Sequence, residues 1–115
     1  RKDVAEAVEK GLVILSERQN ENGGYQYNAT EQVSCESVAQ VIVALAELGI
    51  SLDDPRFVKN GKTLLDGILQ FQCSDGGFSH LMDGETDLLA TEQAFYAMVA
   101  ANRVAQGESS LYRMK

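Results

Sequence analysis

The residues of this chain best suited to acid–base or ligand chemistry are its histidine and two of its glutamates. The single histidine, His80, could coordinate a metal ion or a ligand, although a lone loop histidine is usually solvated. Glu36 and Glu92 are each expected in the first turn of an apolar helix, where the helix dipole favours a carboxylate. In the alternative interpretation, both glutamates bind a polar ligand with help from Gln32 and Gln93.

Aromatic residues could add an apolar wall to such a site. The candidates are Tyr25, Tyr27, Phe78 and Tyr96. A core position is the more usual role of such side chains, and it is favoured here for Tyr25 and Phe78, less so for Tyr27. The predicted ligand-binding residues are therefore Tyr27, Glu36, His80, Glu92 and Gln93.

The two cysteines do not form a recognised motif. Cys35 and Cys73 show neither CxxC nor Cys/His ligand spacing, so we expect small buried hydrophobes rather than a disulfide or metal ligands. Nucleophile-elbow, phosphate-loop and His-Glu-x-x-His motifs are also absent from the sequence. Residues 83–87 have an acidic side chain at every second position. The segment is nevertheless shorter than a calcium-binding loop and lacks its bidentate Glu. We predict no catalytic residue, no metal site and no cofactor.

Composition indicates one folded domain. The chain has 115 residues, of which 44% are hydrophobic and 23% are charged, and its formal net charge is -7. Acidic residues outnumber basic ones, and the basic residues form no cluster. Nucleic acid and anionic membrane surfaces are therefore poor partners. The longest apolar run, residues 41–46, is far shorter than a bilayer-spanning helix, so we also expect no membrane insertion.

Hydrophobic periodicity predicts four helices of two alternating kinds, at about residues 4–18, 33–48, 55–73 and 88–105. The first is amphipathic, and the third repeats its character. The residues of the third helix that should face a core are Phe57, Leu64, Leu65, Ile68, Leu69 and Phe71. The second and fourth are apolar almost all round, so each is expected to be buried on both sides. Gly49 should end the second helix in a left-handed conformation, and Asp54 with Pro55 should begin the third.

A repeated segment joins the two halves of the chain. Residues 19–25, Gln-Asn-Glu-Asn-Gly-Gly-Tyr, align without gaps with residues 72–78, Gln-Cys-Ser-Asp-Gly-Gly-Phe. Paired glycines allow backbone angles closed to other residues, and the aromatic is expected to plug the end of a hairpin. If Gly77 has positive φ, a branched residue there should be strongly destabilising. Aligning Glu36 with Glu92 makes the second loop about three residues longer. The predicted structural residues are Gly23, Gly24, Tyr25, Gly76, Gly77 and Phe78.

These two copies resemble the prenyltransferase and squalene-oxidase repeat, in which Gln, a short polar turn and Gly-Gly-Phe/Tyr precede a helix rich in small residues. The resemblance covers nearly the whole chain, and residues 72–78 match best. It implies membership of the terpenoid cyclase and protein prenyltransferase superfamily, whose members form α/α-toroids with inner and outer helix rings. Thioester domains of complement-like proteins and cobalamin carriers belong to it too. Residues 89–97 look most like bacterial cell-surface proteins that carry such repeats.

The catalytic residues of that superfamily do not carry over to this chain. Residues 87–89 lack the cysteine of the zinc-binding prenyltransferases, and residues 51–54 read Ser-Leu-Asp-Asp where terpene cyclases have Asp-x-Asp-Asp. Around Cys35, the glycines and glutamine of the thioester motif are missing. Family membership therefore predicts the fold better than the function.

The sequence thus predicts an all-α chain that forms one partial α/α-toroid domain over residues 1–115, with hairpins at about 3–50 and 54–106. We expect a non-catalytic module that binds a small molecule or a protein and belongs to a bacterial surface or secreted protein, with a cytoplasmic location as the alternative. The alternative function is a fragment of a prenyltransferase-like or terpene-cyclase-like enzyme whose catalytic residues lie outside this segment. Because two hairpins do not close a toroid, further repeats or copies of the chain are the expected partners.

Overall fold

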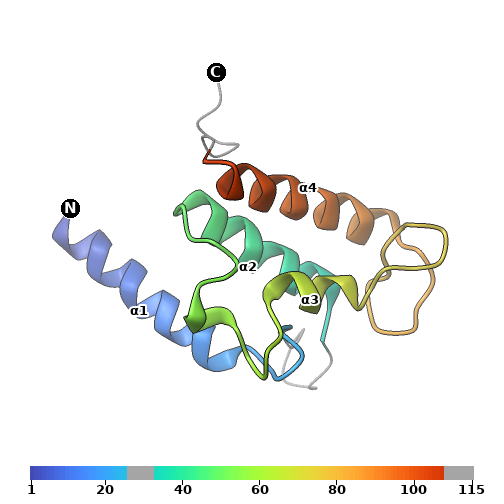
Figure 1. Cartoon of the computed structure of the whole chain (residues 1–115), viewed down its shortest axis with the longest axis horizontal. Helices are drawn as coiled ribbons and strands as arrows, with labels where there is room; N and C mark the ends of the chain where they lie inside the picture. The colour runs from blue at the N-terminus through green and yellow to red at the C-terminus, as the bar shows by residue number, and fades with distance from the viewer. Residues whose placement is uncertain (26–32, 108–115) are drawn as a thin grey trace.

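The computed structural model describes residues 1–25 and 33–107, and there the chain folds into helices joined by turns (Figure 1). Its β-bridges are isolated pairs, and no strand forms within the described ranges. The predicted all-α class is therefore confirmed. The helices are α1 (Lys2–Arg18), α2 (Cys35–Glu47), α3 (Leu64–Leu69) and α4 (Leu88–Ala105), with a short 3₁₀ helix, η1, at Pro55–Phe57.

Helices α2 and α4 form the central pair of the fold. They lie side by side and run in the same direction, whereas α1 lies on the other side of α2 (Figure 1). The N-termini of the pair lie together, because the thiol of Cys35 is 3.9 Å from the carbonyl oxygen of Ala90. Helix α3 also packs against α2. As a result, α2 has helix neighbours on more than one side.

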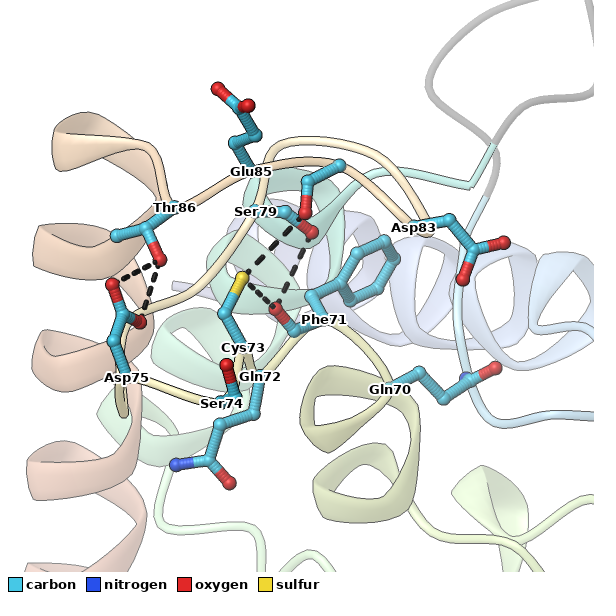
Figure 2. Close-up of a pocket in the computed structure, with 11 residues that line it drawn as sticks. Gln70, Phe71, Gln72, Cys73, Ser74, Asp75, Ser79, Asp83, Glu85 and Thr86 are labelled. Atoms are coloured by element: carbon cyan, nitrogen blue, oxygen red, sulfur yellow. Dashed lines mark hydrogen bonds between the residues drawn. The ribbon is translucent and has the colours of Figure 1, made fainter.

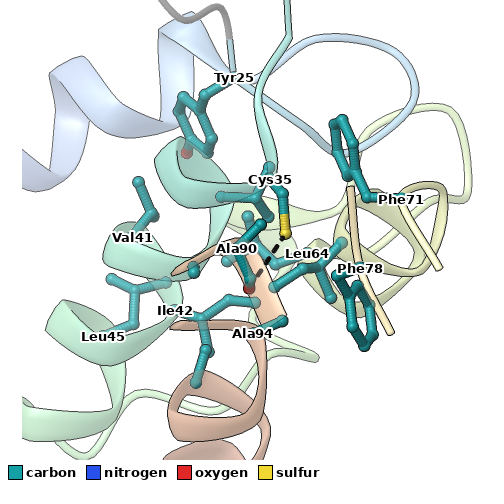
Figure 3. Packing of buried hydrophobic residues seen from close by; sticks show 14 of the residues in the cluster. Tyr25, Cys35, Val41, Ile42, Leu45, Leu64, Phe71, Phe78, Ala90 and Ala94 are labelled. Carbon is teal, nitrogen blue, oxygen red and sulfur yellow. Dashed lines mark hydrogen bonds between the residues drawn. The ribbon is translucent and has the colours of Figure 1, made fainter. Parts of the chain in front are cut away.

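Small side chains let α4 approach α2 closely. Ala90, Ala94 and Ala97 are fully buried, and their spacing of three to four residues places them on one stripe of α4. Figure 3 shows Ala90 and Ala94 beside Cys35 and Ile42 of α2. Burying a side chain such as Ile42 stabilises the fold by about 1.5–3 kcal/mol. The alanine stripe thus determines which face of α4 joins the core.

The opposite face of α4 is exposed, which corrects the expectation that both apolar helices are buried on two sides. In α2 only two residues, Gln40 and Ala44, are exposed, so the expectation holds there. In α4 the large apolar side chains remain in contact with solvent because, within the described residues, α2 is its main helix neighbour. These exposed side chains are Leu88, Leu89, Phe95, Tyr96 and Val99.

The predicted helix over residues 55–73 is wrong as a single element. The chain forms η1, then a tight turn, then the short helix α3. Asn60 and Gly61 make the turn with φ values of 53° and 75°, and the backbones of Lys59 and Lys62 exchange hydrogen bonds of 2.9 and 2.8 Å across it. An Asn-Gly pair is the commonest centre of such turns. The apolar periodicity of the segment obscured this signal.

The interruption changes which apolar residues of this segment are buried. Helix α3 begins again at a capping box, in which Thr63 and Asp66 each bond the other's backbone amide. Phe57, Leu64 and Ile68 are buried as the periodicity indicated. By contrast, the predicted core positions 65 and 69 are exposed leucines, because a six-residue helix buries only one narrow face.

The two Gly-Gly turns share one hydrogen-bond pattern. In the first turn, the amide of Asn20 donates to the carbonyl of Gly24 at 2.9 Å, and the amide of Gly23 donates back to Asn20 at 3.0 Å. The same two bonds recur in the second turn at 2.7 and 3.0 Å, with Cys73 in place of Asn20. The two turns are therefore structural copies, as their sequences indicated.

The two glycines of each pair meet different requirements. The first of each pair has positive φ, 86° at Gly23 and 90° at Gly76, which favours glycine. The second glycine of each pair does not have positive φ. The backbone strain expected for a branched residue at Gly77 therefore does not apply. A Cβ atom at Gly77 would instead collide with the side chain of Thr86.

The spacing from each aromatic to the next helix cap is the same after both turns, which corrects the expected difference in loop length. Tyr25 and Phe78 are buried, as predicted, and each accepts a backbone hydrogen bond from the N-cap of the following helix. Ser34 caps α2 and donates to Tyr25 at 3.3 Å, and Asp87 caps α4 and donates to Phe78 at 2.8 Å. Because the aromatic-to-cap spacing is the same in both copies, the second loop is not longer.

The predicted boundaries between α2 and η1 are confirmed. Gly49 has a φ of 74°, and the amides of Gly49 and Ile50 donate to carbonyls of the last turn of α2 at 3.0 and 2.9 Å. This pair of bonds is a Schellman motif. Asp54 caps η1 by accepting a hydrogen bond from the amide of Arg56 at 2.9 Å.

Candidate functional site

The predicted ligand-binding residues lie in two separate places. Glu36 and His80 meet at the N-terminus of α2, whereas Glu92 and Gln93 lie on α4. Tyr27 lies outside the described residues. The structure therefore gives two candidate sites in place of one.

At the first site, a histidine of the second repeat bonds a glutamate of the first. The Nδ1 atom of His80 lies 2.9 and 3.0 Å from the two carboxylate oxygens of Glu36. Because an ionised carboxylate only accepts hydrogen bonds, Nδ1 carries the proton and donates. The carbonyl of His80 also accepts a hydrogen bond from the amide of Cys35 at 3.0 Å. His80 is thus a partly exposed loop residue that also joins the two halves of the chain.

The cysteine beside this pair is not suited to nucleophilic chemistry. Burial raises the pKa of the Cys35 thiol to about 12, and the neighbouring carboxylates of Glu36 and Asp87 add to the effect. A thiol with so high a pKa stays protonated at neutral pH, and the thiolate is the reactive form. Cys35 is therefore the small buried hydrophobe that we predicted. Cys73 is half-buried, and both cysteines are free.

Glu92 does not occupy the position in its helix that the sequence suggested. It is the fifth residue of α4, and the first turn of α4 contains no acidic residue. Asp87 takes the capping role, since its side chain accepts a hydrogen bond from the amide of Ala90 at 2.9 Å. Glu92 and Glu36 are therefore not equivalent, and Glu92 is exposed.

The second site is a groove on the shared face of α2 and α4. We name it the α2–α4 groove, and its volume is about 330 Å³. It is lined by Ala39, Gln40, Val43, Gln93 and Tyr96. An adjoining hollow of about 500 Å³ shares Gln93 and Tyr96 and adds Glu92, Phe95 and Val99. Two of the five predicted residues, Glu92 and Gln93, thus line one continuous surface.

The side-chain oxygen of Gln93 is a distinctive feature of this groove. The Oε1 atom is buried, and no described residue donates a hydrogen bond to it. An unsatisfied buried acceptor costs about 1–3 kcal/mol. The sequence patterns did not indicate Gln40, Phe95 and Val99 as residues of a site. The signal for the last two was the stripe of large residues on α4 opposite its alanines.

A third hollow lies at the second Gly-Gly turn (Figure 2). It has a volume of about 660 Å³ and is lined by residues 70–75, 79 and 83–86. The hydroxyl of Thr86 donates to both carboxylate oxygens of Asp75 at 2.7 and 2.8 Å. This bond, with a second from the amide of Gly77, lowers the pKa of Asp75. The carboxylate is therefore held by its own loop.

The two turns differ in what covers them. The side chain of Gln19 is buried and donates to the carbonyls of Gly23 and Phe57 at 3.2 and 2.8 Å, so it joins the first repeat to the second. Its counterpart in the second copy, Gln72, is exposed. Likewise, a Cβ atom at Gly23 would collide with the carbonyl of Thr63, whereas one at Gly76 would have no described atom within 4 Å. The second turn thus has the same form, but no segment among residues 1–25 and 33–107 covers it as residues 57–63 cover the first.

In residues 1–25 and 33–107, no group of three or more His, Cys, Asp or Glu side chains is arranged to hold a metal ion. Within the same part of the chain, no helix has the length and apolar character needed to cross a membrane. Comparison with protein families, with curated proteins and with solved structures found no match for this chain.

Proposed function

We propose that this chain is a two-repeat segment of a larger α/α-toroid and acts as a non-catalytic module that binds a small molecule or a protein. The parallel pair α2 and α4 supports the toroid, because inner helices run in the same direction when successive hairpins are oriented alike. The resemblance of residues 89–97 to bacterial cell-surface repeats supports a surface or secreted protein.

The observation that carries the proposal is the difference in cover between two matching turns. The second repeat supplies Gln19 and Gly23 with close neighbours, Phe57 and Thr63. A further repeat of the same kind would supply the same contacts to Gln72 and would pack against the exposed face of α4. Repeat proteins gain much of their stability from such nearest-neighbour interfaces.

The α2–α4 groove is the binding surface in this proposal. It lies between the two inner helices, where apolar walls surround the amide groups of Gln40 and Gln93. Binding sites are commonly concave and apolar with a few polar groups that fix the orientation of the ligand. The groove has this composition without requiring any catalytic residue.

The toroid can be tested by extending the chain with a second copy of residues 54–107 placed after residue 107. We expect one cooperative unfolding transition with a melting temperature several degrees above that of the parent chain, because one more interface forms. In the extended chain, Gln72→Ala should cost about 1–3 kcal/mol, because Gln72 then has carbonyls to bond. Thermal and urea unfolding would measure both effects.

The matched control carries a Gly/Ser tail of the same length, which should leave the melting temperature of the parent unchanged. If the added repeat unfolds separately from the rest, and Gln72→Ala has no effect in the extended chain, the second turn is not a docking surface for a further repeat and the proposal is wrong.

A further inference from the structure

We propose that a pocket beside α3 binds a small apolar molecule that carries a primary ammonium group. The pocket has a volume of about 350 Å³ and lies among α2, residues 51–53, α3 and the C-terminal half of α4. We name it the α3 pocket. It shares no lining residue with the α2–α4 groove, so this site is separate from the binding surface of the proposed function and does not depend on it.

The α3 pocket exists because α3 is too short to cover α4. Helix α4 has 18 residues and is about 27 Å long, whereas α3 has six residues and is about 9 Å long. Ala101 and Ala105 line the pocket and continue the stripe of Ala94, from which they lie at multiples of about 3.6 residues. The pocket is therefore on the alanine side of α4, away from the exposed face that a further repeat would cover.

The walls of the α3 pocket are suited to a hydrocarbon group. Ile42 is fully buried, Met98 is partly buried, and Leu65 is 41% exposed, so the pocket has an apolar floor and an apolar side wall that a ligand can cover. Small-molecule sites have volumes of about 300–1,000 Å³, and this pocket is at the lower end of that range. Its size therefore suits a single ring or a short chain.

One carboxylate at the α3 pocket is available to a ligand. Asp53 lines the pocket and is exposed, and its carboxylate has neither an ion pair nor a hydrogen bond with any described residue. The next residue, Asp54, differs in this respect because it forms an ion pair with Arg56 at 2.9 Å. An ionised carboxylate only accepts hydrogen bonds, and an ammonium group only donates them. Asp53 can therefore bind the ammonium group of a ligand whose apolar part occupies the pocket.

The charge around the α3 pocket also favours a cation. Helices α2 and α4 run in the same direction, so their C-terminal ends, which have partial negative charge, lie at the same end of the pair (Figure 1). The pocket is near these ends, because it is formed by residues 98–105 of α4 and by the loop that follows α2. The bordering segments contain one basic residue, Arg103, which does not line the pocket. With a net charge of -7, the chain should attract an ammonium ion and repel a carboxylate.

The test uses three probes that share a phenyl ring and differ in their polar group. Phenethylamine carries an ammonium group, phenethyl alcohol a hydroxyl group and hydrocinnamate a carboxylate. Titration into the methyl-labelled chain should shift the methyl signals of Met98 and Ala101. The amine should bind about threefold to fivefold more tightly than the alcohol, as expected for an ion pair at an exposed carboxylate, and hydrocinnamate should bind most weakly. Added salt should reduce the difference between the amine and the alcohol.

A pair of isosteric substitutions tests the charge of Asp53. Asp53→Asn should make the amine bind no more tightly than the alcohol and should leave the affinity for the alcohol unchanged. Asp83→Asn makes the same change in an exposed loop outside the pocket and should preserve the difference. Asparagine tolerates the φ of 61° at position 83, and both positions are exposed, so both variants should fold.

A second pair of substitutions tests the location of the bound probe. Leu65 and Leu69 both belong to α3 and are both 41% exposed, but only Leu65 lines the pocket. Leu65→Ala should weaken the binding of the amine and of the alcohol by about threefold or more, because an apolar wall is lost. Leu69→Ala should leave both affinities unchanged.

Each of the two parts of this inference can fail by itself. Equal affinities of the amine and the alcohol, or equal effects of the two asparagine variants, would overturn the preference for an ammonium group. Equal effects of the two alanine variants, or unchanged signals of Met98 and Ala101 with all three probes, would overturn the pocket as a binding site. The repeat-extension experiment decides the toroid separately from both results.

Discussion

Two different constraints limit which residues can replace the paired glycines of this chain. Gly23 and Gly76 have nearly the same positive φ, 86° and 90°. They differ in their surroundings, because a Cβ atom on Gly23 would collide with the carbonyl oxygen of Thr63, whereas one on Gly76 would have no atom of the described part of the chain within 4 Å. Backbone angle and local space are thus separate constraints on the same type of residue.

A matched pair of alanine substitutions separates these constraints. Gly76→Ala should cost about 1–2 kcal/mol, because only the left-handed backbone is strained. Gly23→Ala should cost more, because the backbone of Thr63 must also move away. Urea unfolding would give both free energies. Equal losses at the two positions would contradict the contact between the first turn and the start of α3.

At the scale of elements, side-chain size decides how α4 joins the core. Its buried stripe consists of alanines, and its exposed face carries Phe95 and Val99. Hydrophobic periodicity recognised α4 as apolar but did not say which face would be buried, because both faces are apolar. The difference between small and large residues was the available signal, and it becomes decisive only when α2 lies alongside.

Overpacking tests this interface. Ala94→Leu should destabilise the chain by about 1–3 kcal/mol, because Ala94 is fully buried and leaves no room for three more carbon atoms. The control, Phe95→Leu, changes the adjacent exposed residue and should stay within about 0.5 kcal/mol. Thermal unfolding of the two variants would measure the contrast. A tolerated leucine at position 94 would mean that α4 is not seated on α2 through its alanines.

The third predicted helix shows the limit of periodicity at the same scale. Its apolar spacing correctly indicated that Phe57, Leu64 and Ile68 would be buried. It could not detect the turn at Asn60 and Gly61, because turn formation depends on local backbone preferences and not on hydrophobicity. The Asn-Gly pair is a stronger signal for a turn than the apolar spacing is for a continuous helix at this position.

For the molecule as a whole, the main feature is that two matching turns differ in cover within residues 1–25 and 33–107. Gln19 joins the two repeats through its bonds to Gly23 and Phe57, and Gln72 occupies the same place in the second copy. The two glutamines have the same side chain and the same local turn. Their contributions to stability should differ because Gln19 is buried and bonded to Phe57 of the second half, whereas Gln72 is exposed.

Replacing each glutamine by alanine tests this asymmetry. Gln19→Ala should cost about 1–3 kcal/mol, because it removes a buried donor from two carbonyl oxygens. Gln72→Ala should change the stability of the present chain by no more than about 0.5 kcal/mol, because Gln72 is exposed. Chemical denaturation would compare them. A large loss on replacing Gln72 would show that its turn is already supported from within the chain.

The sequence by itself determined the helical class, the two Gly-Gly turns, the buried aromatics Tyr25 and Phe78, and the stop at Gly49. Each of these follows from local backbone preference or from hydrophobic spacing within one segment. It also identified the separate residues Glu36 and His80 as chemically notable.

Only the tertiary structure decided that Glu36 and His80 bond to each other and that Glu92 and Gln93 belong to another surface. It also decided that α4 keeps an exposed apolar face. These features depend on which distant segments become neighbours when the second repeat packs against the first. Local preferences contain no information about such pairings, because they arise from the packing of whole elements.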